Sequence, residues 1–398
     1  MSARLTRQGW MVLVSAVVAV VIGRMFGVLE LYVIGAAMAL ATIVGLLLVG
    51  VRRPKVRVDR WIRPSVLTAG DVGRVEVLVA RVGTGRSPGF ELVEPVGATR
   101  TARMAVAPLA KGTEVSAGYR IPTERRGVLT VGPLTAVRHD VLGLARAVTT
   151  LAGVDEVLVS PRAYSLAMPA LGQGVLGRHL MALAQRLGPG DFHSLRDYVD
   201  GDEPRSIHWR ASARSENLKV RQHTVEGLRR CLVLLDQHVP LGDHGEEAFE
   251  RAVTAAASVV NSADTAGLST RFVTTDGVDL RGPDVAAQAL HLLARILPST
   301  GPVVPVERDP GEGLGLVIAI TSTSSSAAWT SLERVSDPTL TVIGVFTVDS
   351  PTRSVGLSID ARSESAFLES WNRVAGAGGR EARARQRRDA VVAATVGR

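Results

Sequence analysis

The sequence predicts a multidomain protein with three parts: an N-terminal transmembrane helical hairpin, an antiparallel β-sandwich and a doubly wound α/β sheet. Two long apolar segments occupy residues 1–51, and β-rich runs separated by glycine and proline fill residues 52–161. Residues 229–377 alternate between apolar strands and helices. A chain of 398 residues can hold two such domains beside an anchor. The remaining parts are the charged region 162–228 and the basic tail 378–398, which we expect to be disordered.

The two apolar segments predict a pair of membrane-spanning helices. There are 16 uncharged residues between Arg7 and Arg24, and 21 between Glu30 and Arg52. The second segment is long enough to cross a bilayer, and the first can cross it when its flanking arginines extend toward the headgroups. The alternative is a secretory signal. However, the first segment overruns the usual length of a signal core, and no Ala-x-Ala cleavage site follows directly after Gly23.

The positive charges predict the orientation of the chain. Arg4 and Arg7 precede the first span, and six basic residues against one acid follow the second span within residues 52–63. The positive-inside rule therefore places both flanks in the cytoplasm. We expect a multi-pass protein of the inner (plasma) membrane with most of the chain in the cytoplasm. The one cysteine, Cys231, fits this reducing compartment and excludes an internal disulfide.

The formal net charge of +8 does not indicate a nucleic-acid-binding protein. The basic excess is confined to the flanks of the apolar segments and to the tail, whereas residues 64–377 carry a net charge of −3. Such basic clusters are attracted to anionic lipid headgroups. The tail also lacks interleaved aromatic residues on which bases could stack. We therefore expect the lipid bilayer as a partner and no nucleic acid.

The strand and helix pattern of residues 229–377 predicts where a ligand would bind. The expected strands are 231–235, 268–274, 314–320 and 339–347, and the expected helices are 246–263, 283–296, 324–335 and 362–375. Buried strands separated by helices imply a parallel sheet with helices on both faces. Ligands of such sheets bind beyond the carboxyl ends of the strands, which points to Asp236 and to residues 274–276 and 321–326. The β-sandwich, by contrast, shows no cluster of catalytic groups.

Residues 186–222 are the most informative stretch, because large apolar side chains are interleaved there with acids and bases. A solvated strip would rarely hold Tyr198, Ile207 and Trp209 among such charges, which indicates a partly buried polar network. The positions that stand out are Leu195, Arg196, Tyr198, Gly201, Asp202, Arg205, Ile207, Trp209, Ala213 and Arg214. With this spacing the stretch resembles the signature of the domain-of-unknown-function 58 family, of which every fixed position is present.

The resemblance extends over most of the chain and implies a membrane-anchored protein whose C-terminal domain is similar to a von Willebrand factor type A domain. Genes of this family commonly neighbour those of MoxR-type AAA+ ATPases, and often those of transglutaminase-like membrane proteins. The resemblance therefore implies a bacterial, non-enzymatic scaffold or adaptor for a MoxR-type ATPase. A transglutaminase-like membrane protein would be a second partner, and no cofactor is expected.

Two non-enzymatic hypotheses for the signature stay open. In the structural hypothesis, its arginines pair with its acids and Trp209 fills a seam between domains, because arginine suits bidentate carboxylate pairing. The residues concerned are Arg196, Arg205 and Arg214 with Asp197, Asp202 or Glu203. In the docking hypothesis, the signature is a partner-binding face, because arginine and tryptophan are enriched among interface hot spots.

The enzymatic alternative is a hydrolase that uses the acids and histidines of the signature region. The candidate groups are His193, Asp197, Asp200, Asp202 and His208. Neither Ser194 nor Ser206 lies in a nucleophile elbow or beside an oxyanion glycine motif. We therefore expect no enzymatic activity and assign no catalytic residue.

The type A resemblance also implies a metal site to be weighed. In such domains the first strand ends in Asp-x-Ser-x-Ser, whose oxygens bind a divalent cation. Here Asp236 is followed by His238 and Pro240 at the serine positions. Because Mg²⁺ needs oxygen ligands and Pro240 offers none, we expect no bound metal and keep only Asp236 as a candidate ligand. The alternative, a divalent-cation-dependent adhesion module, would need further oxygens from residues 274–276.

Overall fold

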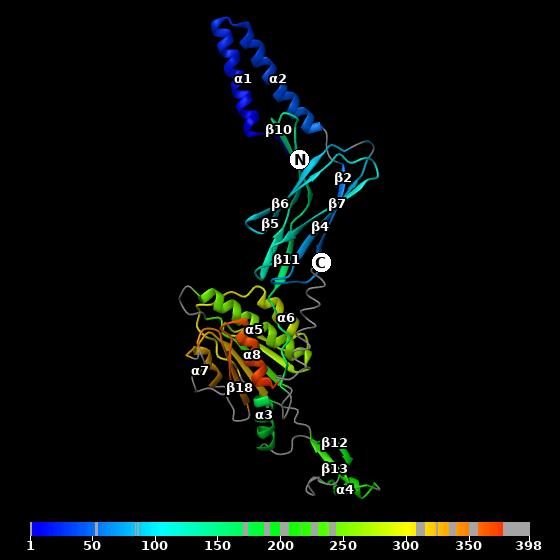
Figure 1. Cartoon of the computed structure of the whole chain (residues 1–398), viewed down its shortest axis with the longest axis vertical. Coiled ribbons are helices and arrows are strands. Elements are labelled where there is room, and N and C mark those ends of the chain that lie inside the picture. The colour runs from blue at the N-terminus through cyan, green and yellow to red at the C-terminus, as the bar shows by residue number, and fades with distance from the viewer. Residues whose placement is uncertain are drawn as a thin grey trace. The chain divides into compact units, whose positions relative to one another are not determined.

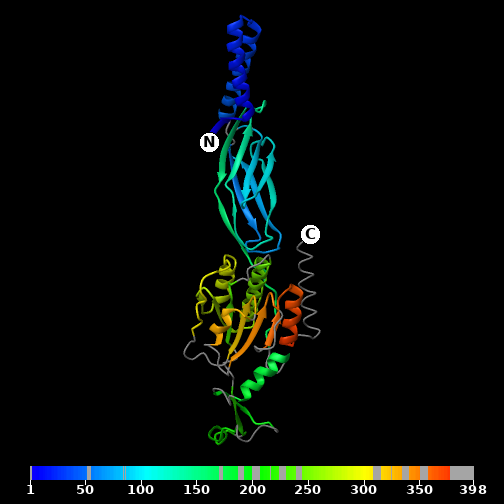
Figure 2. The same ribbon diagram turned by 90° about the vertical axis from the view of Figure 1, so that its left-hand side faces the viewer.

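A computed structural model of the whole chain shows its architecture (Figures 1 and 2). It describes residues 2–51, 55–83, 85, 87–169, 174–186, 192–199, 207–215, 217–223, 230–238, 244–307, 315–323, 325–333, 340–349 and 357–376. The chain divides into two compact units, Met1–Ser160 and Pro161–Arg398. The first unit holds two apolar helices and a β-rich region. The second unit holds an α/β region and a separate β-hairpin.

The two apolar helices confirm the N-terminal helical pair. α1 spans Arg7–Phe26 and α2 spans Leu29–Val51, and both are long and apolar enough to cross a membrane. Gly27, in the left-handed conformation at φ 68°, ends α1 and allows the tight reversal. Small residues let the helices approach closely, since Gly35 lies against Val20 and the carbonyl of Ala16. Most of the large apolar side chains of the two helices are exposed.

The β-rich region consists of two sheets. Its strands are β1 (Ser2–Leu5), β2 (Val56–Arg63), β3 (Leu67–Thr68), β4 (Gly73–Arg81), β5 (Phe90–Val96), β6 (Arg100–Val106), β7 (Glu114–Ile121), β8 (Gly127–Val131), β9 (Leu134–His139), β10 (Ala145–Ala152) and β11 (Asp155–Ser160). The larger sheet has the order β1-β10-β9-β5-β8-β11-β3, with β6 beside β5, and the smaller has the order β2-β4-β7. Pairing is antiparallel except between β11 and β3, where it is parallel, so the predicted all-antiparallel pattern is wrong there.

One hydrophobic core joins the two sheets. Alternate residues of β4, Val75, Val77 and Val79, are fully buried, as expected for a strand with one face on the core. They belong to the same cluster as Leu92 of β5 and Leu134 of β9 in the other sheet. β1 was not predicted. It lies ahead of α1 and pairs with β10, so the first residues of the chain are an edge strand of the larger sheet.

The α/β region is built on a six-stranded sheet. Its strands are β14 (Arg230–Leu235), β15 (Ser269–Thr274), β16 (Asp279–Leu280), β17 (Gly315–Thr321), β18 (Leu340–Phe346) and β19 (Leu357–Asp360), and its helices are α3 (Gly174–Arg186), α5 (Gly245–Thr265), α6 (Val285–Leu293), α7 (Ala327–Glu333) and α8 (Glu364–Ala375). The strand order is β16-β15-β14-β17-β18-β19, and only the pairing of β16 is antiparallel. The alternating strands and helices predicted here are present. β16, β19 and α3 were not predicted.

Helices cover both faces of this sheet. Odd-numbered residues of β14 such as Val233 pack in one core with α3, α5, α6 and α8. Even-numbered residues such as Leu234 pack in a second core with α7, which contributes Trp329. Residues 161–168 belong to the first core: the indole N–H of Trp371 on α8 donates to the carbonyl of Ala167 at 2.9 Å. Because β14, β15 and β17 are parallel neighbours, their carboxyl ends lie at the same edge of the sheet, where polar loops meet.

Candidate functional site

The described signature residues lie on a small β-hairpin, here called the signature hairpin (residues 192–199, 207–215 and 217–223). β12 (Phe192–Asp197) pairs antiparallel with β13 (Lys219–His223), and the short helix α4 (Trp209–Ser212) lies between them in the sequence. The N–H of Tyr198 donates to the carbonyl of Leu218 at 2.8 Å, and the N–H of His208 donates to the carbonyl of Lys219 at 2.7 Å. The sequence did not predict this hairpin, because its strands carry no regular alternation of apolar and polar residues.

His208 starts α4. Its Nδ1 accepts a hydrogen bond from the N–H of Ala211 at 3.0 Å, so the imidazole caps the helix. The hydroxyl of Ser212 donates to the carbonyl of His208 at 3.1 Å and accepts from the N–H of Lys219 at 2.8 Å. These contacts fasten α4 to β13. Since Nδ1 is engaged as an acceptor, this nitrogen is not available to take a proton from a substrate.

Asp197 forms an ion pair with Lys219 across the hairpin. The hydrogen bond from the ammonium group of Lys219 lowers the pKa of Asp197 below its ordinary value. An acid held ionised in this way is a poor proton donor. The structural hypothesis expected Asp197 to pair with an arginine of the signature, and Lys219, just beyond the signature, was missed. The signal that could have found it is the hairpin register, which places these two residues opposite each other.

Trp209 corrects the structural hypothesis. Its side chain was expected to fill a seam, but the residue is 66% exposed. Val199 and Leu218, which the sequence analysis did not single out, are exposed as well. Tyr198 and Ile207 are half-buried. An exposed tryptophan beside two exposed aliphatic residues is typical of a surface that binds a partner.

A basic concavity lies in the same hairpin. It has a volume of about 410 Å³ and is lined by His208, Arg210, Ala211, Arg214 and Lys219. Arg210 and Arg214 are exposed, and neither forms an ion pair with a carboxylate in the part of the chain that the structure describes. Arginine pairs with carboxylates in a bidentate geometry, so this concavity suits an anionic group of a ligand.

The other signature positions are located only in part. Leu195 and Arg196 lie on β12, opposite Arg221 and Val220 of β13, and Ala213 follows α4. His193 and Ser194 also lie on β12. The residues that fall outside the described part of the chain are Asp200, Gly201, Asp202, Glu203, Arg205 and Ser206. The proposed pairing of Arg196, Arg205 and Arg214 with acids therefore stays a prediction.

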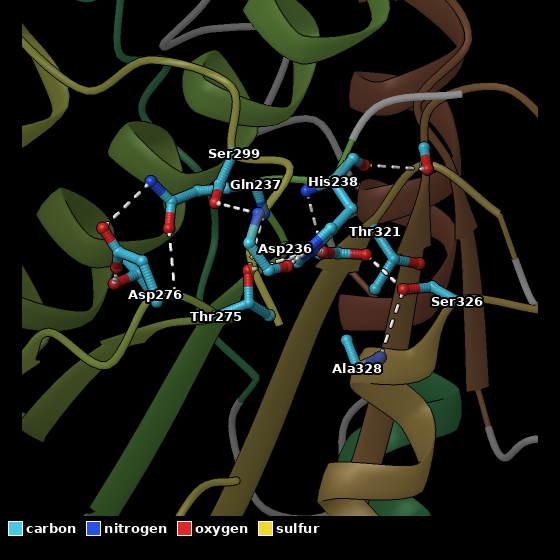
Figure 3. Close-up of polar contacts among 12 residues, drawn as sticks. Asp236, Gln237, His238, Thr275, Asp276, Ser299, Thr321, Ser326 and Ala328 are labelled. Carbon is cyan, nitrogen blue, oxygen red and sulfur yellow. Dashed lines mark hydrogen bonds and ion pairs between the residues drawn. The ribbon is translucent and has the colours of Figure 1, made fainter. Parts of the chain in front are cut away.

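The carboxyl edge of the six-stranded sheet holds a second polar cluster (Figure 3). Asp236 follows β14, and its carboxylate is completely buried. It accepts hydrogen bonds from the hydroxyl of Ser326, from the N–H of His238 at 3.0 Å and from the hydroxyl of Thr275 at 3.4 Å. The predicted meeting of Asp236 with residues 274–276 and 321–326 is thus observed. The groups come together because parallel strands end at one edge.

His238 lies between two acceptors at this edge. Its Nδ1 lies 3.0 Å from Oδ1 of Asp236, and its Nε2 lies 2.6 Å from the carbonyl oxygen of Gly301. A carboxylate and a carbonyl can only accept, so this geometry favours the protonated form of the ring, in which both nitrogens donate. Burial alone would lower the pKa of His238. The hydrogen bonds to Gly301 and Asp236 outweigh burial and raise this pKa above its ordinary value.

These contacts do not fit a divalent cation. The oxygens of Asp236 are engaged by Ser326, Thr275 and His238, and the imidazole of His238 stands where a type A domain would present its first serine. Asp276 faces away from Asp236, since it bonds to Thr274 and lies 3.3 Å from the amide nitrogen of Gln237. Within the described ranges, no group of three or more His, Cys, Asp or Glu side chains could hold a metal. Pro240 lies outside those ranges.

Comparisons with known proteins give one family and no informative structural relative. No curated protein matches the chain. The PKD domain of a peptidase from a Thermoplasmatales archaeon is similar at 16% identity over 26% of this chain and 92% of that chain, with a TM-score of 0.18. The alkylpurine DNA glycosylase AlkC of Pseudomonas fluorescens is similar at 13% identity over 33% of this chain and 38% of that chain, with a TM-score of 0.19. The sporulation control protein Spo0M of Bacillus subtilis is similar at 10% identity over 36% of this chain and 58% of that chain, with a TM-score of 0.16.

TM-scores this low carry no argument about the fold or the function of this chain. The family comparison is specific. Residues 194–316, which include the signature hairpin from Ser194 onward and the carboxyl edge at Asp236, match the family described as protein of unknown function DUF58. This region of the chain is therefore similar to the DUF58 family.

Proposed function

We propose that the chain is a membrane-anchored, non-enzymatic adaptor that binds a MoxR-type AAA+ ATPase through its signature hairpin. The observation that carries this proposal is the exposure of Trp209 near Arg210 and Arg214, which form no ion pair with a described carboxylate. Tryptophan and arginine dominate binding hot spots, and a folded protein gains nothing by exposing an indole that has no partner. A transglutaminase-like membrane protein is the second proposed partner.

The chemistry of the described residues supports a non-enzymatic role. The hydrolase alternative needs acids and bases that are available to a substrate. His208 instead caps α4, Asp197 is paired with Lys219, and His238 is held between Asp236 and Gly301. The adhesion alternative needs a metal at Asp236, whose carboxylate is occupied by protein donors. Among the residues that the structure describes, no specific contact favours either alternative.

The proposed domain types are a β-sandwich and a type A-like domain. Two sheets that share one core support the first. For the second, the support is the sheet order, which reads 3-2-1-4-5-6 when the strands are numbered from β14, with an antiparallel edge strand. In this proposal the type A-like domain has lost its metal site and keeps the fold as a rigid support for the signature hairpin.

The hairpin's surface indicates the chemistry of the segment that it binds. His208, Arg210, Arg214 and Lys219 line a concavity that suits carboxylates, and Trp209 offers an apolar contact beside it. The complementary segment is acidic and carries a large apolar side chain. We propose that the ATPase presents such a segment to the hairpin.

Affinity purification from native membranes tests the adaptor proposal. The full chain should recover a MoxR-type ATPase in a nucleotide-dependent manner, compared between ATP and a non-hydrolysable analogue. Trp209→Ala should weaken this binding by about 2 kcal/mol, roughly 30-fold, because a hot-spot indole is removed. Trp61→Ala is the matched control, since Trp61 is another exposed tryptophan but lies on β2. Failure to recover any ATPase under either nucleotide would refute the proposal.

Cysteine labelling tests the proposed cytoplasmic orientation in the inner membrane. Met25 near the end of α1 and Val72 before β4 are both exposed, so Met25→Cys and Val72→Cys report on the two sides of the bilayer. A membrane-impermeant maleimide should label only Met25→Cys in cells whose outer layers are permeabilised. Native Cys231 adds little background, because burial raises the pKa of its thiol to about 12. The reverse labelling pattern would show that the domains lie outside the cytoplasm.

A further inference from the structure

The turn between β9 and β10 carries an unusual pair of residues at its tip. The N–H of Gly143 donates to the carbonyl of Asp140 at 3.1 Å, and Gly143 adopts a φ of 70°, which closes a β-turn. The two central residues are Val141, which is 100% exposed, and Leu142, which is 62% exposed. Central turn positions usually hold Gly, Pro, Asn, Asp or Ser. Two aliphatic side chains at the tip therefore indicate contact with an apolar phase.

Asp140 holds this turn in shape. Its carboxylate accepts hydrogen bonds from the N–H of Leu142 at 3.1 Å and from the N–H of Ala145 at 2.6 Å. The N–H of Asp140 in turn donates to the carbonyl of Ala145 at 3.0 Å. An aspartate whose carboxylate accepts hydrogen bonds from nearby backbone N–H groups in this way fixes a tight turn. Val141 and Leu142 are thus presented on a rigid support, and they cannot fold back into the sheet core.

The same turn is fastened to the start of α1. The N–H of Thr6 donates to the carbonyl of Leu144 at 2.9 Å, and the hydroxyl of Thr6 donates to the carbonyl of Gly143 at 2.7 Å. Gly9 lies directly against the Leu144 carbonyl, where a Cβ atom would be only 2.0 Å from that oxygen. Only glycine allows this approach. The turn is therefore level with the first turn of α1.

The turn also contacts α2 inside its apolar segment. A Cβ atom on Gly45 would lie 3.0 Å from the carboxylate of Asp140, and Val49 packs with Ala145 and Ala147 of β10. Gly45 precedes the end of α2 at Val51 by six residues, about 9 Å of helix rise. In a chain whose helices span a bilayer, this places the turn at the boundary between headgroups and acyl chains.

We propose that the Asp140–Gly143 turn is an interfacial membrane anchor, with Val141 and Leu142 inserted among the lipids. This inference rests on the membrane anchoring proposed above. An apolar tip that enters about 5–10 Å below the headgroups matches the depth of other interfacial elements. Two side chains are too small a patch for a stable protein interface, which buries about 800 Å² on each partner. Lipid is therefore the favoured occupant.

The arginine side chains near the turn indicate which lipid headgroups the anchor would prefer. Arg4 of β1 and Arg146 of β10 are both exposed and lie directly opposite each other in register. Like charges at such a position destabilise an antiparallel pair. Arg7, at the start of α1, is exposed as well. An anionic headgroup between Arg4 and Arg146 would relieve the repulsion, so the anchor should prefer anionic lipids.

Fluorescence of variants with one introduced cysteine in nanodiscs tests the proposal, since native Cys231 is buried. The full chain with Val141→Cys would carry an environment-sensitive dye in nanodiscs that contain lipids spin-labelled near the headgroup. We expect blue-shifted emission and at least about twofold stronger quenching than for Val72→Cys. Val72 is a matched exposed valine at the far end of β4, since Arg81 at the other end pairs with Val56, which follows α2. Val44→Cys, on α2, reports on the spanning helix itself.

The outcomes separate this inference from the anchoring on which it rests. Quenching at Val44→Cys without quenching at Val141→Cys would overturn the turn proposal and leave the anchoring intact. Absence of quenching at both positions would overturn both. Arg146→Glu should reduce the quenching at Val141→Cys in anionic nanodiscs but leave it unchanged in neutral ones. Equal quenching in both lipids with and without this substitution would contradict the headgroup preference.

Discussion

Replacing Glu94 with alanine is expected to destabilise the β-rich region by about 3–5 kcal/mol, the cost of breaking a buried ion pair by removing one partner. The carboxylate of Glu94 is completely buried and pairs with Arg60, whose side chain is 5% exposed. The hydroxyl of Tyr119 donates to Oε2 of Glu94 at 2.7 Å. Without the carboxylate, Asp155 is the one anionic partner that Arg60 keeps among the described residues, 2.6 Å away and largely exposed. Tyr119 loses its acceptor as well.

Chemical denaturation of the full chain, followed by hydrogen exchange in β4 and β5, measures this effect. Glu91→Ala is the matched control on the same strand, because Glu91 forms only a surface pair with Arg103 at 3.7 Å. Such a pair contributes about 0–1 kcal/mol. Burial and the hydrogen bond to Glu94 raise the pKa of Tyr119, so Glu94→Ala should also bring the titration of this tyrosine closer to its ordinary range. Equal stability of Glu94→Ala and Glu91→Ala would show that the ion pair is not structural.

Replacing His238 with alanine is expected to destabilise the α/β region by about 2–3 kcal/mol, less than for a fully buried pair because His238 is partly exposed. Asp236 would keep Ser326 and Thr275 as donors but lose its cationic partner. The loop at Gly301 would also lose its contact with the imidazole. Thermal unfolding of His238→Ala against His244→Ala measures the effect, since the side chain of His244 is almost fully exposed.

The pH dependence of the free energy of unfolding gives a second test of the contribution of His238. The pKa of His238 is higher in the folded chain than in the unfolded chain, where it is about 6.5. The folded state therefore binds the proton more tightly. The stabilisation is fully present below pH of about 6.5, declines as the pH rises through the raised pKa, and is absent in His238→Ala. Stabilisation of the native chain by Mg²⁺ that disappears in Asp236→Ala would instead support a metal at this edge.

The sequence predicts the elements whose pattern is local. The apolar length of α1 and α2 and the buried runs of β14, β15, β17 and β18 identify them without knowledge of their neighbours. β1 is different, because four residues become a strand only where the edge of β10 is available to pair with them. β16, with two residues, depends in the same way on β15.

The candidate sites also contain some contacts that the sequence predicts and others that depend on residues distant in the chain. Asp236 and its neighbours could be predicted to meet, since strand ends of a parallel sheet share one edge. The bond from His238 to Gly301 joins residues 63 positions apart and depends on a loop path that no sequence pattern reveals. Trp209 was placed in a seam because interleaved charge indicated burial. The structure exposes it, because a two-stranded hairpin has no second layer to cover an indole.

The pairing of β1 with β10 has a consequence for how the protein is made. Residues 2–5 leave the ribosome before their partners at residues 145–148, which are synthesised roughly 7–30 s later at about 5–20 residues per second. Both apolar helices emerge in that interval. The edge of the larger sheet can therefore be completed only after both helices have been synthesised, and in the proposed membrane anchor only if both ends of the helical pair lie on one side of the bilayer. In that anchor, insertion of only one of the two helices would leave residues 2–5 and 145–148 on opposite sides, and this edge of the sheet would stay open.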